Sequence, residues 1–239
     1  MSVVNQDNVR DRQDLLDKAE KFVKDHMAGY DPSHDWHHVQ RVRKLAIRIA
    51  KTLDPLPDLL VVELTALFHD LDDHKYRTES SPTLSELLNP LLNHKALNSE
   101  QSNLIIKIIP NISYTTEIKL QKLNQWNWQL NINELKVVQD SDRLDAIGSI
   151  GILRLAAYSC KINRKLINED QNNINNNNNN NNEQKIGQSA EDHFEEKLLK
   201  VKDRMKTPFG KLEAERRHKT MIDFLTSLER EREILYEDE

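Results

Sequence analysis

Residues 59–76 read LLVVELTALFHDLDDHKY, a dense apolar run that ends in a cluster of histidine and acidic residues. The apolar part, about 59–68, contains neither Gly nor Pro, and Pro57 precedes it at a place where prolines often open helices. We expect a buried helix there. The run is interrupted by Glu63 and is too short to cross a bilayer, so other parts of the chain must cover it.

His69 and Asp70 follow this expected helix directly. A buried carboxylate without a partner is costly, and a divalent cation would offset that cost. The carbonyl end of a helix also favours a cation. The alternative is a solvated helix end with scattered charges, which we prefer for Asp72 and His74. For the His69-Asp70 pair we favour a cation site, with the alternative left open.

Most of the remaining chain repeats its apolar residues at helical spacing. The expected helices lie at about 15–27, from a cap at Asp31–Ser33 to Ile49, at 83–92 after Ser81-Pro82, and at 99–109, 133–160, 190–206 and 211–235. Residues 111–131 are ambiguous, and no segment alternates convincingly as a strand. We therefore predict an all-α fold.

The composition excludes several classes of protein. The chain has 239 residues, 5 Gly, 7 Pro and one Cys. Few Gly and Pro disfavour folds with many tight turns, and a single Cys excludes an internal disulfide framework. A net charge of −5 argues against nucleic-acid binding. The N-terminus lacks an apolar signal segment, so we expect a soluble, cytoplasmic protein with no membrane partner.

Residues 168–182 read NEDQNNINNNNNNNN. Asn favours local hydrogen bonds over helix, and this segment has almost no apolar surface to bury. We expect residues 168–188 to form a disordered insertion within a single domain of residues 1–239, whose core spans about 12–235. A prion-like role is the alternative, but a tolerated loop expansion is the simpler interpretation.

A second histidine cluster, HDWHHVQRV, occupies residues 34–42. On a helix, His38 shares one stripe with Val42, so its ring should face the core, with His34 one turn earlier on the same side. His37 falls on another side and should be exposed. His38 is about equally consistent with a hydrogen-bonded core histidine and with a ligand, because two histidines four residues apart can face one ion.

A third cluster, VVQDSDRLDAIGSIGILR, covers residues 137–154. Asp142 and Asp145 are three residues apart and share a helix face with apolar residues, whereas Asp140 falls on a different face. Two carboxylates on a packing face need a metal ion, an Arg or several donors. The alternative is a surface ion pair with Arg143.

The three clusters present His38, the His69-Asp70 pair and Asp142, each on a separate helix face. Mixed nitrogen and oxygen ligands suit Mn²⁺, Fe²⁺, Zn²⁺ or Mg²⁺ better than a soft metal ion. Four protein ligands would leave open positions on an octahedral ion for water and a phosphate oxygen.

In this order the clusters resemble the HD-domain metal-dependent phosphohydrolase superfamily. HVQRV resembles its first motif, ALFHD its second, and the Asp before Arg in DSDRLDA its last. The likeness is closer to a branch of small bacterial-type proteins with HDWxHxxRV, HDxxDxKY and QDxDRLDAIGxIGIxR. It covers about residues 12–235, including HFEEKLLKVKDRMKT and AERRHKTMIDFL but not the Asn tract.

The resemblance implies one all-α HD-type domain with a single metal ion held by His38, His69, Asp70 and Asp142. It also implies hydrolysis of a phosphate ester or anhydride of a small molecule, with a nucleotide as the expected substrate. Members of the branch are similar to nucleoside triphosphate pyrophosphohydrolases. We expect Mn²⁺ or Mg²⁺, with Fe²⁺, Co²⁺ or Zn²⁺ as alternatives, and a monomer or homodimer.

Three residues are candidates for catalytic roles. Asp73 would orient or deprotonate the attacking water, although a plain loop carboxylate is an alternative. Lys75 would neutralise phosphate charge. His34 would be a substrate-facing acid or would support a metal ligand.

Three others are candidates for substrate binding. Arg41 and Arg143 would also neutralise phosphate charge, although a structural ion pair is as consistent with each. Asp145 has the same two interpretations as His34, facing substrate or supporting a ligand.

Two other functions stay open. A regulatory protein that binds nucleotides without turnover would keep the same residues, but the complete ligand set gives no sign of an inactive site. A di-iron oxygenase with an HD-type fold would need more histidines between the second and third clusters. Only His74 and His94 occur there, and neither belongs to a convincing motif.

Overall fold

The computed structural model describes residues 3–71, 81–168 and 189–236. Within these ranges the elements are helices, apart from one isolated bridge between Lys165 and Ser189, so the predicted all-α fold is confirmed. The α-helices are α1 (Val3–His26), α2 (Trp36–Ala50), α3 (Leu59–Phe68), α4 (Leu84–Leu92), α5 (Ser99–Ile108), α6 (Tyr114–Lys122), α7 (Asn133–Asp145), α8 (Gly148–Lys161), α9 (Ala190–Glu196) and α10 (Pro208–Tyr236). Short 3₁₀ helices are η1 (Ile109–Asn111), η2 (Trp128–Asn131) and η4 (Leu198–Arg204).

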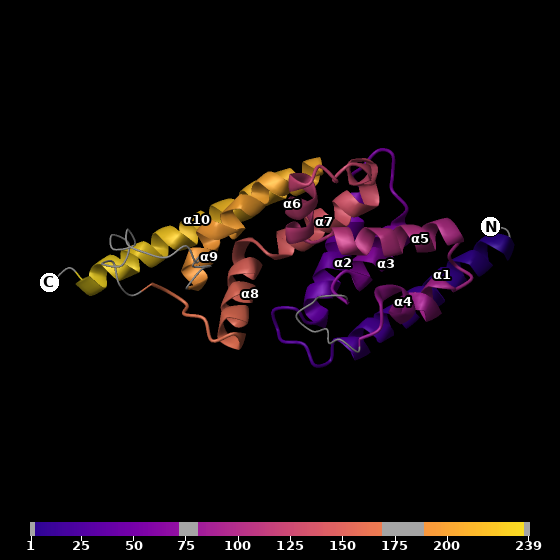
Figure 1. The fold of residues 1–239 in the computed structure, drawn as a ribbon, viewed down its shortest axis with the longest axis horizontal. Coiled ribbons are helices and arrows are strands. Elements are labelled where there is room, and N and C mark those ends of the chain that lie inside the picture. Colours follow the sequence, from indigo (N-terminus) through magenta and orange to yellow (C-terminus); the bar gives the residue numbers. More distant parts are fainter. Residues whose placement is uncertain (1–2, 72–80, 169–188, 237–239) are drawn as a thin grey trace.

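Helix α3 lies among the N-terminal helices in the right half of Figure 1 and packs against α1, α2, α5 and α7. Asp58 caps it by accepting hydrogen bonds from the backbone N–H groups of Leu60 and Val61. The buried residues of this helix are Leu60, Val61, Val62, Leu64, Thr65, Ala66, Leu67 and Phe68. Because α3 is covered on most sides, its C-terminal end lies in the interior. His69, which directly follows the helix, is therefore buried.

Helix α2 packs against both α3 and α7. Its buried stripe consists of His38, Val39, Val42, Ala46, Ile49 and Ala50. His37 is exposed, as the helical spacing predicted. The two contacts of α2 bring the second and third sequence clusters next to the end of α3.

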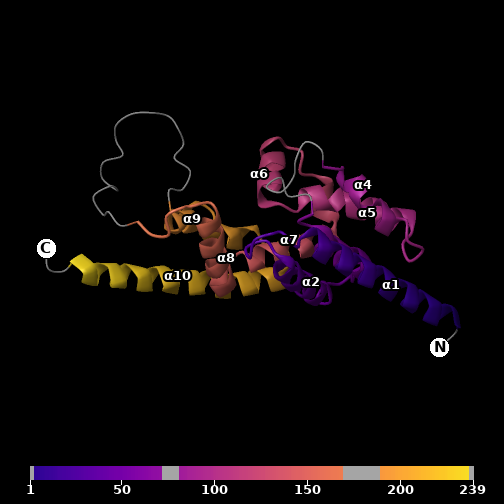
Figure 2. The same ribbon diagram turned by 90° about the horizontal axis from the view of Figure 1, so that it is seen from below.

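The C-terminal part of the chain covers the other side of α7. Helix α10 packs against α8, α7 and η4, and its far end extends past α9 (Figure 2). Its contact with α8 is close, because a Cβ on Gly148 would lie 2.9 Å from the Cβ of Arg217. None of the described helices has both the length and the apolar character needed to span a membrane.

The structure divides two helices that the spacing predicted as continuous. The expected helix over 133–160 is wrong, because α7 ends at Asp145 and α8 begins at Gly148. Ile147 is extended, and Gly148 has a φ of +73°, a conformation that costs glycine little. The segment 190–206 is also divided, into α9 and η4. Apolar spacing does not reveal such breaks when the pieces on both sides face one core.

Three predicted helix starts are also wrong. Helix α1 begins at Val3 rather than near residue 15, and the caps of α2 and α4 lie later than predicted. Helix α2 is capped by Asp35, whose carboxylate accepts the His38 backbone N–H at 3.0 Å, rather than by residues 31–33. His34 therefore lies in the turn before α2. Helix α4 is capped by Thr83, in a reciprocal capping box with Glu86, rather than by Ser81-Pro82. In both cases the structure uses a later residue of the same capping type.

Residues 72–80 and 169–188 lie outside the described ranges. Asp73 and Lys75 fall in the first gap, and nearly all of the expected insertion falls in the second. The roles of these two residues, the disorder of the insertion and the single-domain organisation stay predictions.

Candidate metal centre

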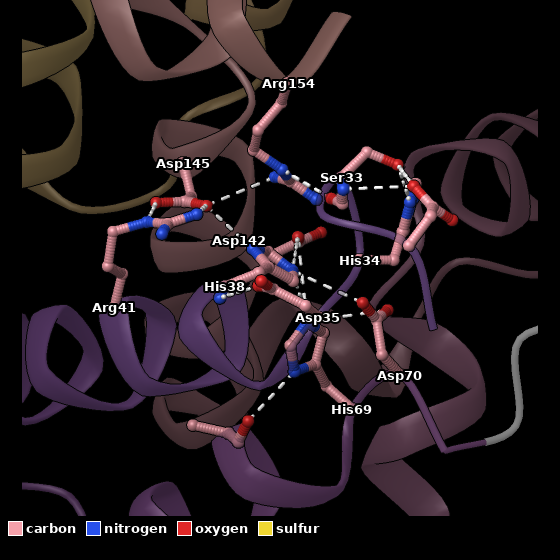
Figure 3. Close-up of polar contacts among 12 residues, drawn as sticks. Ser33, His34, Asp35, His38, Arg41, His69, Asp70, Asp142, Asp145 and Arg154 are labelled. Carbon is pink, nitrogen blue, oxygen red and sulfur yellow. Dashed lines mark hydrogen bonds and ion pairs between the residues drawn. The ribbon is translucent and has the colours of Figure 1, made fainter. Parts of the chain in front are cut away.

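Three helices bring the four predicted ligands together (Figure 3). His38 comes from the first turn of α2, His69 and Asp70 directly follow α3, and Asp142 comes from the last turn of α7. One ligand atom each from His38, His69 and Asp142 lies within 4.8 Å of the others, close enough to share one ion. The fourth residue, Asp70, places Oδ2 3.3 Å from Nε2 of His38.

Both imidazole rings direct Nε2 into this group. The two Nε2 atoms are 3.1 Å apart, and Oδ1 of Asp142 lies 3.6 Å from Nε2 of His38 and 3.8 Å from that of His69. Oδ1 of Asp70 is 3.5 Å from Nε2 of His69. His38 and His69 are buried, whereas Asp142 is partly exposed, so the group is open to solvent on the Asp142 side.

The partners of the other ring nitrogens determine which atoms can bind a metal ion. Nδ1 of His69 lies 2.9 Å from the carbonyl oxygen of Ala66, which only accepts, so Nδ1 carries the proton and neutral His69 has a lone pair on Nε2. Nδ1 of His38 lies 2.7 Å from Oδ2 of Asp145, and the same reasoning applies. Two lone pairs therefore face each other beside two carboxylates.

Asp70 supports the fit of a cation. Its Oδ2 is buried and has no hydrogen-bond partner among the described residues, which is costly for a carboxylate oxygen. Burial raises the pKa of Asp70, but its interactions with His69 and His38 outweigh burial and hold that pKa well below its usual range, so the carboxylate is ionised. A divalent ion would satisfy both carboxylates and both Nε2 lone pairs, so these residues fit one.

Asp145 supports this group without joining it. Its carboxylate accepts from Arg41 Nε at 2.7 Å and Nη2 at 2.9 Å, and from Arg154 Nη1 at 3.3 Å, in addition to His38. Burial raises the pKa of Asp145, but hydrogen bonds from His38 and Arg41 outweigh burial and lower that pKa below its usual value. The carboxylate therefore stays ionised. It therefore fixes the orientation and tautomer of His38.

A cavity of about 520 Å³ opens next to the four residues. The described residues that line it are His34, His69, Asp70, Ile109, Pro110, Ile112, Ser113, Tyr114, Thr115, Thr116, Asp142, Arg143, Ala146, Arg154, Lys197, Leu198 and Val201. Its wall combines the start of α6, apolar side chains and three cationic side chains. Such a cavity has room for a small anionic ligand beside the candidate metal position.

His34 is oriented by a short chain of hydrogen bonds. The Ser33 hydroxyl donates to Oδ1 of Asp31 and lies 2.7 Å from Nδ1 of His34. Because the single hydroxyl proton goes to Asp31, Nδ1 of His34 must be the donor to Ser33. The ring can therefore accept or release a proton at Nε2.

The chain is similar in sequence and in structure to known proteins. The chain is 34% identical over 210 residues to the uncharacterized protein YpgQ of Bacillus subtilis (strain 168), an alignment that covers 88% of this chain and 90% of YpgQ. A crystal structure of an HD-superfamily hydrolase from Bacillus thuringiensis matches with a TM-score of 0.65 and 30% identity, over 92% of this chain and 97% of that chain.

This chain belongs to the HD superfamily. This chain also matches a crystal structure of Bacillus subtilis YpgQ in complex with ADP, with a TM-score of 0.70 and 30% identity, over 92% of this chain and 96% of that chain. No protein-family model matches the chain.

The three residues predicted to bind substrate, Arg41, Arg143 and Asp145, are engaged in contacts with other protein groups. Arg41 is engaged with Asp145 and is not among the described residues that line the cavity. Arg143 lines it, but is buried and donates from Nη2 to Glu117 at 2.6 Å and from Nη1 to the Arg204 carbonyl at 2.9 Å. The ion pairs of Arg41 with Asp145 and of Arg143 with Glu117 match the structural interpretation that the sequence left open. Asp145 contacts His38 and is not among the described residues that line the cavity.

Three features of the site were not predicted from the sequence. They are Arg154, the chain from Asp31 through Ser33 to His34, and the cavity wall at Ser113–Thr116. Arg154 had a signal, because it closes the GIxR end of the third motif. The other two had none, since they depend on a turn and on a helix from the ambiguous segment 111–131.

Proposed function

We propose that this protein is a divalent-metal-dependent phosphohydrolase that acts on a nucleotide. The observation that carries the proposal is the convergence of His38, His69 and Asp142, with Asp70 beside them, at the wall of a cavity that also presents cationic side chains. The hydrolase from Bacillus thuringiensis supports the reaction class, and the ADP complex of YpgQ supports the ligand class.

His38, His69, Asp70 and Asp142 would hold the ion, for which Mn²⁺ or Mg²⁺ suits the mixed ligand set best. A bound divalent ion would polarise a phosphoryl oxygen and lower the pKa of a water molecule. Asp145 keeps His38 in the tautomer that leaves Nε2 unprotonated. The cavity next to these residues would bind the rest of the substrate.

His34 is our candidate for proton transfer. Asp31 and Ser33 hold its Nδ1, which leaves proton exchange to Nε2, and the ring lines the cavity. Protonated His34 would donate to the oxygen of the leaving group. Asp73 is proposed to orient or deprotonate water, and Lys75 to neutralise phosphate charge. Within the nucleotide class, we propose cleavage of a nucleoside triphosphate to the monophosphate and pyrophosphate.

A substrate panel tests the proposal. Nucleoside mono-, di- and triphosphates and simple phosphate esters are incubated with Mn²⁺, Mg²⁺ or a chelator, and products are resolved by chromatography. We expect metal-dependent turnover of nucleoside triphosphate to monophosphate and pyrophosphate. Release of inorganic phosphate alone would correct the bond assigned. Slow release that persists in Asp142→Asn would indicate a contaminant and would contradict the proposed function.

Asp73→Asn tests the proposed base. Its metal content should equal that of the unaltered protein, and turnover should fall by about 10²-fold or more, because general base catalysis contributes that much. Metal content is measured on the same samples as turnover. Unchanged turnover would remove Asp73 from the mechanism without affecting the metal site.

A further inference from the structure

Three arginines lie near the candidate metal centre, and they differ in how their N–H groups are used. Both terminal nitrogens of Arg143 are engaged in buried contacts, and its Nε is also buried. Arg41 makes two short hydrogen bonds to Asp145 and is absent from the described cavity wall. Arg154 is the arginine that combines a place in the cavity wall with a terminal nitrogen that no described residue engages, whereas the donor that Arg143 leaves without a described partner is its fully buried Nε.

The contacts of Arg154 leave one edge of its guanidinium available. Nε donates to the Ser33 carbonyl oxygen at 2.8 Å, and Nη1 donates to Oδ2 of Asp145 at 3.3 Å. Nη2 has no hydrogen bond within residues 3–71, 81–168 and 189–236. In the view of Figure 3 the guanidinium lies between Asp145 and Ser33, whereas Arg41 approaches Asp145 from the other side.

The charges around Asp145 do not balance. One carboxylate faces two guanidinium groups, and His38 is neutral when its Nε2 binds a metal ion. A divalent ion would be neutralised by Asp70 and Asp142. Arg41 also interacts with the carboxylate of Asp35, so the guanidinium whose charge is least compensated is that of Arg154, which makes the longer bond to Asp145. Because Arg154 is mostly buried, an anion in the cavity would compensate a poorly solvated charge.

We propose that Arg154 is a substrate-binding residue that contacts a phosphate group of the nucleotide beside the metal ion. This inference rests on the proposed function for the identity of its ligand. The planar guanidinium suits a phosphate, since two N–H groups can bind two of its oxygens. Its bonds to Ser33 and Asp145 hold the group in place before the ligand arrives, which lowers the entropy cost of binding.

The experiment compares Arg154 with Arg41, which is a matched control because both bind the same carboxylate. Arg154→Gln, Arg154→Lys, Arg41→Gln and Arg41→Lys are tested for binding of ADP and of inorganic pyrophosphate by calorimetry, in the presence of Mn²⁺. Mn²⁺ binding is titrated separately, and thermal unfolding shows that each variant folds. Pyrophosphate lacks the nucleoside, so it isolates contacts to phosphate.

We expect Arg154→Gln to weaken both ligands by about tenfold or more, the effect of losing hydrogen bonds to a charged group. Arg154→Lys, which keeps the charge without the fork, should lose less. The Arg41 variants should share any loss of Mn²⁺ affinity that results from disturbing Asp145, but should bind ADP and pyrophosphate more tightly than Arg154→Gln. If Arg154→Gln does not fold, Arg154→Lys against Arg41→Lys decides by the same comparison.

Equal losses in the Arg154 and Arg41 variants would overturn the inference, because the effect would then act through Asp145. Unchanged ligand affinity in Arg154→Gln, or no binding of either ligand by the unaltered protein, would also overturn it. A protein that binds ADP with the expected Arg154 effect but hydrolyses no nucleotide would support the inference and contradict the proposed function. Nucleotide hydrolysis by the unaltered protein, combined with equal losses of ligand affinity in the Arg154 and Arg41 variants, would support the proposed function and contradict the inference.

Discussion

Asp140 and Asp142 lie two residues apart on α7 and have opposite surroundings. Asp140 is fully buried and accepts from Lys206 N at 2.8 Å, Thr207 N at 2.8 Å and Thr207 Oγ1 at 2.7 Å. Asp142 accepts no hydrogen bond from the described residues, and its carboxylate lies near the Nε2 atoms of His38 and His69. Two similar side chains on one helix thus face different chemistry.

The comparison shows how a structural carboxylate differs from a candidate ligand. Donors surround Asp140, which joins α7 to the segment before α10, and a Cβ on Gly210 would lie 2.2 Å from its Oδ2. Burial raises the pKa of Asp140, and the hydrogen bonds from Thr207 and Lys206 only partly offset this. The carboxylate of Asp142 instead lies near the Nε2 atoms of His38 and His69, which carry lone pairs when the rings are neutral. A carboxylate without donors beside imidazole lone pairs fits a cation.

The largest effect should come from Asp142→Asn. A neutral amide is a poorer ligand for a hard cation, so we expect Mn²⁺ affinity to fall by about 10²-fold or more, beyond the loss typical of residues that only support a ligand. Hydrolysis should fall with it. Metal content and turnover measured on the same sample check this. Full metal content in Asp142→Asn would break the comparison, since Asp142 would then not be a ligand.

Asp145→Asn should have the next largest effect. The change weakens the partner of His38 Nδ1, and outer residues of this kind typically contribute 10–100-fold in metal affinity. Titration with Mn²⁺ measures the loss, which should be smaller than that of Asp142→Asn. An equal or greater loss would indicate that Asp145 itself binds the metal ion.

Metal binding should also weaken as the pH falls. Burial and Arg154 lower the pKa of His38, but Asp145 and Asp70 raise it more, so its net shift is upward. A proton therefore competes with the ion for Nε2 over a range that begins above the ordinary histidine value. We expect Mn²⁺ affinity to fall by about tenfold per pH unit below that pKa. Titrations between pH values of about 8 and 6 test this, and constant affinity would contradict it.

Asp140→Asn should leave metal binding nearly unchanged and lower stability instead. An amide places N–H groups or a weaker acceptor opposite three donors, so we expect a loss of about 1–3 kcal/mol in the free energy of unfolding. The unfolding midpoint should fall by about 2–4 °C per kcal/mol. Thermal unfolding and metal content are measured together. A variant that loses metal and keeps its stability would reverse the roles of Asp140 and Asp142.

Much of the fold could be predicted because hydrophobic spacing records which side of a helix is buried. The bounds of α3 and the inward stripe of α2 follow from it directly. The break at Gly148 could not be predicted, since α7 and α8 both contribute apolar residues to the interior. The caps at Asp35 and Thr83 were missed because neighbouring residues have the same capping chemistry, and local sequence does not decide between them.

The approach of His38, His69-Asp70 and Asp142 could be expected from three separated clusters and their resemblance to one family. Sequence could not decide whether Arg41 or Arg143 faces a ligand, because an arginine that binds phosphate and one in an ion pair have the same local pattern. Arg143 is matched to Glu117, which comes from a segment without a clear helical period. Only the packing of α6 against its neighbours brings that charge into place.

The central claim is that His38, His69, Asp70 and Asp142 together hold one divalent ion that hydrolysis requires. The most direct measurement removes metal with a chelator and titrates Mn²⁺ back while following both bound metal and nucleotide turnover. We predict no turnover in the metal-free protein, and recovery in proportion to one bound ion per chain. Undiminished turnover in chelator, or two tightly bound irons per chain, would contradict the account.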